Sequence, residues 1–138
     1  MTDPAAEVFT LLERGFLDEH DVGRLATTDR VGLPHVVPVA YRRNPDLHTI
    51  DVVWRGLAGA PAFAHVDSAG QAAFVVDDIA PPWRVRTLQV RGAAEALRTR
   101  AGALIRIRPD RITTSGLDGS PSTRDRTVRI STPRGVRP

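Results

Sequence analysis

Between about residues 20 and 118 the chain alternates apolar and polar residues with a period of two. That spacing is typical of β-strands with one buried face, because successive side chains point to opposite sides of a sheet. In residues 34–42, for example, Val37 falls on one face and Pro38 on the other. The alternation predicts strands at residues 22–28, 34–42, 47–54, 71–77 and 84–97, and a last hairpin of residues 103–108 and 111–114.

Turn and bulge residues separate these strands. Gly32 suits the positive φ of a hairpin turn, and Pro45 is preset for a type I turn. Pro109 is expected in the turn of the last hairpin, and Gly92 marks a β-bulge within the long strand. About six antiparallel strands, one of them long and bent, predict a mostly β fold that closes into a small barrel, because closure removes exposed sheet edges. A two-layer α+β sandwich is the alternative.

Two short helices complete the predicted fold. An N-terminal helix is expected after the cap Asp3-Pro4 and up to Gly15, on apolar residues at helical spacing: Val8, Leu11, Leu12 and Phe16. A small helix is expected around residues 61–66. Residues 1–118 should form one domain, and residues 119–138 a basic, mobile tail in which Val128 and Ile130 could add an edge strand.

Composition limits the function classes. The 138 residues include no cysteine, which excludes disulfides, thiolate metal sites and cysteine nucleophiles. All nineteen basic residues are arginine, but residues 119–138 carry a net charge of +4 and residues 1–118 a net charge of −1. A nucleic-acid-binding face is therefore not expected on the domain. With no apolar run long enough for a membrane span and no signal peptide, we expect a cytoplasmic protein.

The order of these segments resembles the pyridoxamine 5'-phosphate oxidase-like FMN-binding split barrels. Within that family the chain is most similar to the actinobacterial branch that uses the deazaflavin coenzyme F-420. The resemblance is carried in colinear order by residues 24–27, 32–39, 44–47, 49–51, 73–78, 82–84, 91–95, 105–107, 111–112 and 116–118. It implies a split β-barrel that forms a homodimer, with F-420 or FMN and a small-molecule ligand in clefts between the subunits.

The sequence departs from this pattern where the branch holds the cofactor phosphate. A pair of glycines at the end of the third strand is replaced by Val53-Trp54, and a Ser-Lys-Lys stretch by residues 60–62, which are Ala-Pro-Ala. The next basic position is Ala64, and an aromatic residue expected ahead of Gly116 is Ser115. Each lost charge-assisted hydrogen bond weakens phosphate binding by roughly ten- to a hundred-fold, so other cations must compensate if a flavin binds.

The resemblance places the cofactor among eight residues of this chain. The flavin ring would lie along the second strand, Trp54 would form a wall, Ala60 would mark the altered phosphate loop, and arginines would replace the missing cations. The predicted cofactor-binding residues are thus Val37, Pro38, Val39, Trp54, Arg55, Ala60, Arg84 and Arg86. Core packing is the alternative for Trp54, and ion pairs with Asp77 or Asp78 are the alternative for arginines of residues 84–91. No catalytic residue is assigned.

Two function hypotheses follow. One is a small flavin- or deazaflavin-dependent oxidoreductase that moves a hydride to or from a small organic substrate. The other is a split barrel that has lost the flavin and binds or transforms another small molecule, as a cyclase or isomerase of a biosynthetic pathway would. Haem binding would need a histidine in the cleft. The four histidines lack metal-ligand spacing, although His35 and His48 could meet across neighbouring strands, and Tyr41 could exchange a proton.

Overall fold

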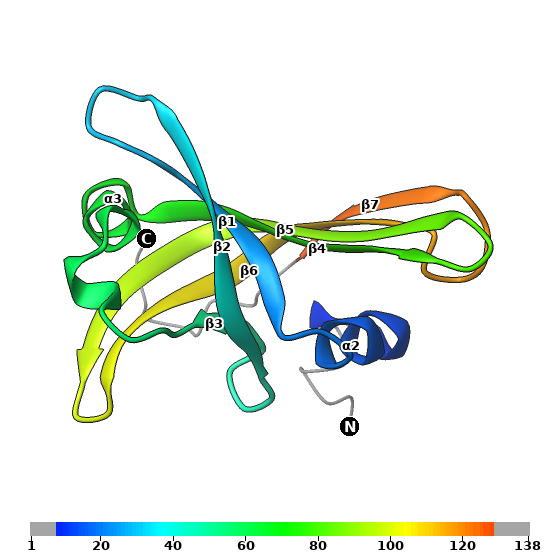
Figure 1. The fold of residues 1–138 in the computed structure, drawn as a ribbon, viewed down its shortest axis with the longest axis horizontal. Helices are drawn as coiled ribbons and strands as arrows, with labels where there is room; N and C mark the ends of the chain where they lie inside the picture. Colours follow the sequence, from blue (N-terminus) through cyan, green and yellow to red (C-terminus); the bar gives the residue numbers. More distant parts are fainter. Residues whose placement is uncertain (1–7, 129–138) are drawn as a thin grey trace, which may run out of the picture.

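The computed structural model describes residues 8–128 as an antiparallel β-barrel with two helices (Figure 1). The strands are β1 (Val22–Thr28), β2 (Pro34–Asn44), β3 (Thr49–Val52), β4 (Gln71–Ala80), β5 (Arg84–Thr99), β6 (Gly102–Ser115) and β7 (Thr123–Thr127). Their order is β3-β2-β1-β4-β5-β6-β7, and a further pairing of β3 with β6 closes the first six strands. The predicted mostly β barrel is therefore confirmed, with β7 outside it.

The barrel interior holds the large apolar side chains that the alternation predicted. Their inward faces come from every barrel strand and from both helices, and the fully buried members include Leu25, Ile50, Phe74, Leu88, Ile105 and Ile107. Burial at roughly 25 cal/mol per Å² of apolar surface makes this interior the main source of stability. The barrel wall is thus a rigid support for whatever binds on its outside.

The bulge at Gly92 explains one difference from the predicted strands. The β5–β6 register shifts between Arg91 and Gly92, as expected, and Gly92 lies opposite Pro109. Pro109 is buried within β6, so the predicted hairpin turn at Pro109-Asp110 is wrong and β6 is one strand. Proline has no N–H to donate to the ladder, and it lies beside the bulge of its own strand, where Asp110 is the extra residue between the partners of Arg91 and Gly92. A Cβ on Gly92 would lie 1.9 Å from the carbonyl oxygen of Arg108, so only glycine fits.

The N-terminal helix α2 (Leu11–Asp18) ends later than predicted. Thr10 caps it in a capping box with Glu13, while Asp3 and Pro4 lie outside the described residues. Gly15 lies inside the helix, so the predicted end at Gly15 is wrong. The helix continues because Phe16 and Leu17 are buried against the barrel, which outweighs the weak helix propensity of one glycine.

Strands β4 to β7 extend beyond the barrel as a sheet with α2 beside it (Figure 1). Strand β7 lies within the predicted tail and pairs with Arg111–Ser115 of β6, so the ordered sheet continues past residue 118. Arg126 of β7 donates to the buried carboxylate of Glu13 at 2.5 and 2.6 Å, which ties this strand to α2. Val128 is buried, and residues 129–138, with Ile130, lie outside the described residues.

At the opposite end of the barrel, a one-turn helix η1 (Leu57–Gly59) leads into α3 (Pro61–Ala69). The predicted small helix is confirmed and is one turn longer, because Gly70 in the left-handed conformation caps its end. Helix α3 packs against β1 and β5 and buries Phe63 and Val66. Within residues 8–128, no helix is long and apolar enough to cross a membrane.

Candidate functional site

The three predicted residues of β2 do not share a face. Val39 is 4% exposed and belongs to the core, and Val37 is half-buried against it. Pro38 lies on the outer face with Val36, which is 68% exposed. A strand allows only alternate residues to face one ligand, so a flat group on the outside of β2 would contact Pro38 and Val36, while Val37 and Val39 support the wall from within.

The segment between β3 and α3 holds three further predicted residues. Trp54 is half-buried and packs against the core. Arg55 is exposed, and none of the ion pairs of the described residues includes it. Ala60 is the N-cap of α3 and offers no side-chain hydrogen bond, with Pro61 at the first helical position. The guanidinium of Arg98 lies 4.9 Å from the ring centroid of Phe63, so a second arginine stands beside the first turn of α3.

Arg84 and Arg86 lie far from this segment within one chain. They begin β5 at the β4–β5 turn, and the ten-residue strand β4 separates that turn from α3 by roughly 33 Å. Arg86 donates to both oxygens of Asp78 at 2.8 and 2.5 Å and to Glu19 at 3.3 Å. These hydrogen bonds lower the pKa of Asp78 and raise that of Arg86. Arg86 thus forms an ion pair with Asp78. This is the alternative to cofactor binding that the sequence analysis gave for the arginines of residues 84–91.

Arg84 differs from Arg86 in its surroundings. Its Nε is buried and has no hydrogen-bond partner among residues 8–128. Trp83, its neighbour in the turn, is 78% exposed. The structure therefore separates the predicted cations into two sets, Arg55 near α3 and the pair Arg84 and Arg86 at the opposite end, and does not bring them together in one chain.

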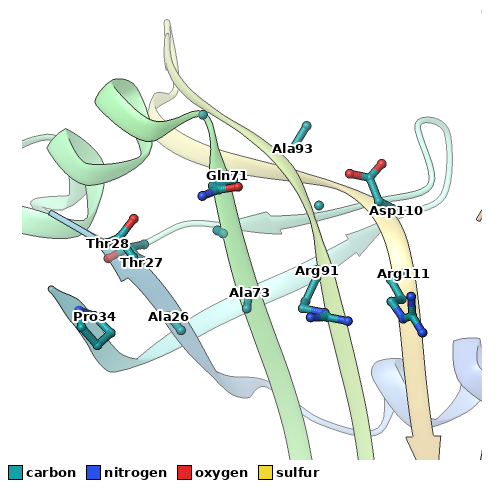
Figure 2. A pocket seen from close by; sticks show the side chains of 13 residues that line it. Ala26, Thr27, Thr28, Pro34, Gln71, Ala73, Arg91, Ala93, Asp110 and Arg111 are labelled. Carbon is teal, nitrogen blue, oxygen red and sulfur yellow. The ribbon is translucent and has the colours of Figure 1, made fainter. Parts of the chain in front are cut away.

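A groove of about 600 Å³ crosses the outer face of β1, β4, β5 and β6 (Figure 2). Small side chains, Ala26 and Ala73, line its floor, and Arg91 and Arg111 project from the β5 and β6 side. Arg111 is held by Asp125 of β7 at 2.9 and 2.5 Å. The volume lies within the range of small-molecule sites, and the small side chains of the floor leave room for a ligand.

A second cavity of about 620 Å³ lies between the turn of the β1–β2 hairpin and α3. It is lined by Asp29, Arg30, Val31, Ala64, His65, Asp67 and Ser68. Nδ1 of His65 is 2.9 Å from the hydroxyl of Thr27, and the ring centroids of His65 and His35 are 4.6 Å apart. The cavity therefore has one imidazole in its wall, His65, and His35 packs against that ring.

Asp29 organises the hairpin turn beside these rings. Its carboxylate accepts hydrogen bonds from the N–H groups of Val31 and Leu33 and from Nε2 of His35, each at 3.0 Å. The hydrogen bonds from His35 and Leu33 lower the pKa of Asp29. The suggested contact of His35 with His48 is replaced by the contact with His65, because His48 lies in the β2–β3 turn. Sequence spacing gave no sign of this cluster, which joins a hairpin to a helix thirty residues away.

Tyr41, which could exchange a proton by the sequence analysis, and His20 are both held by the fold. The hydroxyl of Tyr41 is buried and donates to the carbonyl of Leu17 at 2.6 Å, and burial raises its pKa above the ordinary range. His20 bonds to the carbonyl of Phe16 at 2.8 Å and to Asp78 at 2.9 Å. Neither side chain offers a polar atom to a ligand.

Comparison with known proteins supplies the family. No protein-family model matches the chain. A 5a,11a-dehydrotetracycline/5a,11a-dehydrooxytetracycline reductase of Streptomyces rimosus is 37% identical over 125 residues, which cover 83% of this chain and 88% of that protein.

Solved structures share the fold. An FAD-binding protein of Mycobacterium smegmatis superposes with a TM-score of 0.61 at 19% identity, over 77% of this chain and 93% of its own. A Listeria innocua protein assigned as a pyridoxamine 5'-phosphate oxidase superposes with a TM-score of 0.60 at 15% identity, over 72% and 92%. The chain belongs to the pyridoxamine 5'-phosphate oxidase-like split-barrel family, in the actinobacterial branch that includes the Streptomyces reductase.

Proposed function

We propose that this protein is a reductase that uses a deazaflavin or flavin to transfer a hydride to a small organic substrate. The observation that carries the proposal is the 37% identity, over most of both chains, to a reductase named for a dehydro compound. By analogy, the substrate is a polycyclic molecule with a conjugated carbon–carbon double bond. The groove of about 600 Å³ on the barrel wall has a volume suited to such a molecule.

The donor set of this chain fits a phosphate-bearing cofactor only if arginines replace the family's cations. Ala60, Pro61 and Ala64 supply no charge. Arg55 precedes η1, and Arg98 stands over Phe63 in the first turn of α3. Two guanidiniums can each donate to phosphate oxygens, so we assign them the role of holding this group. When bound, the cofactor supplies two-electron chemistry; Pro38 and Trp54 would orient its ring and exclude water from one side.

The cleft is proposed to form between two copies of the chain. Exposed apolar side chains lie on the outer faces of neighbouring strands, among them Val22, Val36, Ile79 and Val85. An apolar sheet face of this kind is costly in water and suits an isologous dimer interface. In such a dimer, Arg84 and Arg86, which lie at the far end of the barrel from Ala60, would reach the cofactor only from the second copy.

A reduction assay tests this proposal. The purified protein would be incubated anaerobically with reduced F-420 or reduced FMN and with 5a,11a-dehydrotetracycline as the probe substrate. Oxidation of the cofactor together with a product heavier by two hydrogens supports the proposal. A cofactor that binds but is not oxidised by this probe or by related polycyclic enones would contradict the proposed substrate class.

The replacement of basic residues by Ala60, Pro61, Ala62 and Ala64 favours one alternative. In it, the barrel and dimer cleft remain but the flavin is lost, and the cleft binds or transforms a polycyclic compound without a cofactor, as a cyclase or isomerase does. Quenching of Trp54 emission by such a compound, with no binding of F-420 or FMN, would favour this alternative over the reductase.

A further inference from the structure

His65 and His35, the imidazole pair beside the β1–β2 hairpin turn, can supply a proton. Among the side chains described above, no other group is available for this role. Reduction of a conjugated double bond adds a hydride and a proton, so the site requires a proton donor as well as a reductant. We propose that His65 is this proton donor and that Thr27, His35 and Asp29 position it. This inference rests on the proposed reductase function.

The geometry leaves one nitrogen of His65 available. Nδ1 lies 2.9 Å from the hydroxyl oxygen of Thr27, whereas no described residue hydrogen-bonds to Nε2. His65 lines the cavity of about 620 Å³, so Nε2 can meet a ligand there. When an imidazolium gives up its Nε2 proton, the neutral ring keeps the proton on Nδ1, and the buried hydroxyl of Thr27 can accept a hydrogen bond from it.

The neighbouring ring is fixed as well. Nε2 of His35 donates to Asp29 at 3.0 Å, and Asp29 is itself held by the N–H groups of Val31 and Leu33. The ring of His35 then packs on His65 at 4.6 Å between centroids. Asp29 holds His35, and His35 packs on His65, so rotation of the His65 ring is limited. A proton donor needs this restriction because its Nε2 must stay directed at one position.

The charges around the cavity oppose a bound anion. Two carboxylates, Asp29 and Asp67, and one guanidinium, Arg30, line the cavity with His65. His35 faces the ring from β2, and Thr27 faces it from β1. The net negative lining opposes a bound phosphate. The cavity is therefore not suited to the cofactor's phosphate.

The position agrees with the proposed ring site along β2. His35 precedes Pro38 by three residues, a separation of roughly 10 Å along the strand, and its side chain lies on the opposite face; β3 pairs only with residues 41–44 of β2, so this part of the strand is an edge between the two faces. A polycyclic substrate lying between the ring site and the cavity can span that distance. His20 and Tyr41 are held by backbone and carboxylate partners, and His48 lies in the turn at the other end of β2, so His65 is the remaining donor among the groups considered.

The proposed step balances. When bound, a reduced deazaflavin or flavin would supply two electrons and one hydrogen as a hydride to one carbon of the double bond. Nε2 of His65 supplies the second hydrogen as a proton to the other carbon, or to the carbonyl oxygen conjugated with it. The product gains two hydrogens, the cofactor is oxidised by two electrons, and the imidazole regains its proton from water through the open cavity.

Single-turnover kinetics with His65→Ala test the step. With reduced F-420, or reduced FMN if that is the cofactor bound, and 5a,11a-dehydrotetracycline, the rate should fall by about 10²- to 10⁴-fold. The Kd for the oxidised cofactor, measured by ring fluorescence, should not change, and added imidazole should restore part of the rate. His65→Gln serves as a second variant if the alanine variant folds poorly. His48→Asn, at a position with φ of 60° that asparagine tolerates, is the control and should react at the wild-type rate.

A second readout needs no cofactor. Nitrogen-15 NMR of the imidazole rings should show neutral His65 with its proton on Nδ1, and Thr27→Val should shift that proton toward Nε2. A wild-type rate in His65→Ala with bound cofactor would overturn this inference and leave the reductase proposal intact. An Nε2-protonated neutral His65 in the wild-type protein would also overturn it. Failure of the wild-type protein to bind any cofactor would overturn the reductase proposal and this inference with it.

Discussion

Asp51 and Arg106 are register partners at the point where β3 closes the barrel on β6, and they form a two-pronged ion pair. Nε and Nη2 of Arg106 donate to the two carboxylate oxygens at 3.1 Å each. Asp51 is fully buried and also accepts hydrogen bonds from Asn44 at 3.0 Å and Thr49 at 2.8 Å. With four donors on one buried carboxylate, the charge is compensated, and the pair fixes the register of the four-residue strand β3.

Removing the charge of Asp51 should destabilise the barrel. Asp51→Asn keeps the shape but leaves the guanidinium of Arg106 without its carboxylate, so we expect a loss of about 3–5 kcal/mol in the free energy of unfolding. Urea denaturation measures it. Asp77→Asn is the matched control, because Asp77 pairs with Arg24 on the exposed outer face and should cost under about 1 kcal/mol. Equal losses in the two variants would contradict the role given to Asp51.

The same carboxylate predicts a pH dependence of stability. Burial raises the pKa of Asp51, but the hydrogen bonds from Arg106, Asn44 and Thr49 outweigh it, so the pKa in the folded protein lies below the ordinary value. A carboxyl with a lowered pKa stabilises the fold above its unfolded pKa of about 3.9 and loses that contribution as the pH falls through the folded value. The free energy of unfolding should therefore decrease from about pH 5 downward, and less steeply in Asp51→Asn. Parallel pH profiles of the two proteins would contradict this assignment.

Gly92 should tolerate no side chain. A methyl group there would overlap the carbonyl oxygen of Arg108, so Gly92→Ala should destabilise the protein by about 1–3 kcal/mol or more. Thermal unfolding would detect the change. Gly15→Ala is the control for which we expect a change of the opposite sign, because no atom lies within 4 Å of a Cβ built at that exposed helix position. That variant should gain about 0.5–1 kcal/mol, and a gain at Gly92 as well would mean that the bulge does not need glycine.

The proposed dimer predicts a change in mass on substitution of Val36. Its side chain is 68% exposed on the outer face of β2, beside Pro38. Val36→Asp would place a charge in the interface and should convert a dimer of 15.0 kDa chains into a monomer. Sedimentation equilibrium measures the mass. Leu47→Asp, in the β2–β3 turn and 45% exposed, should remain a dimer, and a monomeric wild-type protein would refute the interface.

Much of the barrel could be predicted because the alternation of side chains depends only on which face is buried. Strand β1 has the predicted limits 22–28, and the register shift falls at Gly92 as predicted, although the extra residue, Asp110, is in the facing strand. The strand ends were less predictable. Pro109 has the features of a turn residue, and only the bulge next to it in β6, at Asp110, explains why it lies inside that strand. Gly15 looked like a helix end, but the burial of Phe16 and Leu17 decided otherwise.

The candidate site could be predicted less well, because it depends on tertiary neighbours. The pairing of Arg86 with Asp78 follows from strand register, and the sequence left it as one of two possibilities. His65 and His35 meet because α3 packs beside the β1–β2 hairpin, a contact that no local pattern encodes. Arg98 likewise reaches Phe63 only through the packing of β5 on α3. The cofactor-binding roles of Arg55, Arg84 and Trp54 stay predictions.

Equilibrium titration with oxidised F-420, FMN and FAD tests the central claim most directly. Ring fluorescence and the emission of Trp54 and Trp83 would be followed together, in the wild-type protein and in Arg55→Ala, with Arg100→Ala in the β5–β6 turn as control. We predict micromolar binding of F-420 or FMN, weakened by roughly ten- to a hundred-fold in Arg55→Ala and unchanged in Arg100→Ala. The absence of binding by all three cofactors up to about millimolar concentration would contradict the reductase account and favour a barrel whose cleft no longer uses a flavin.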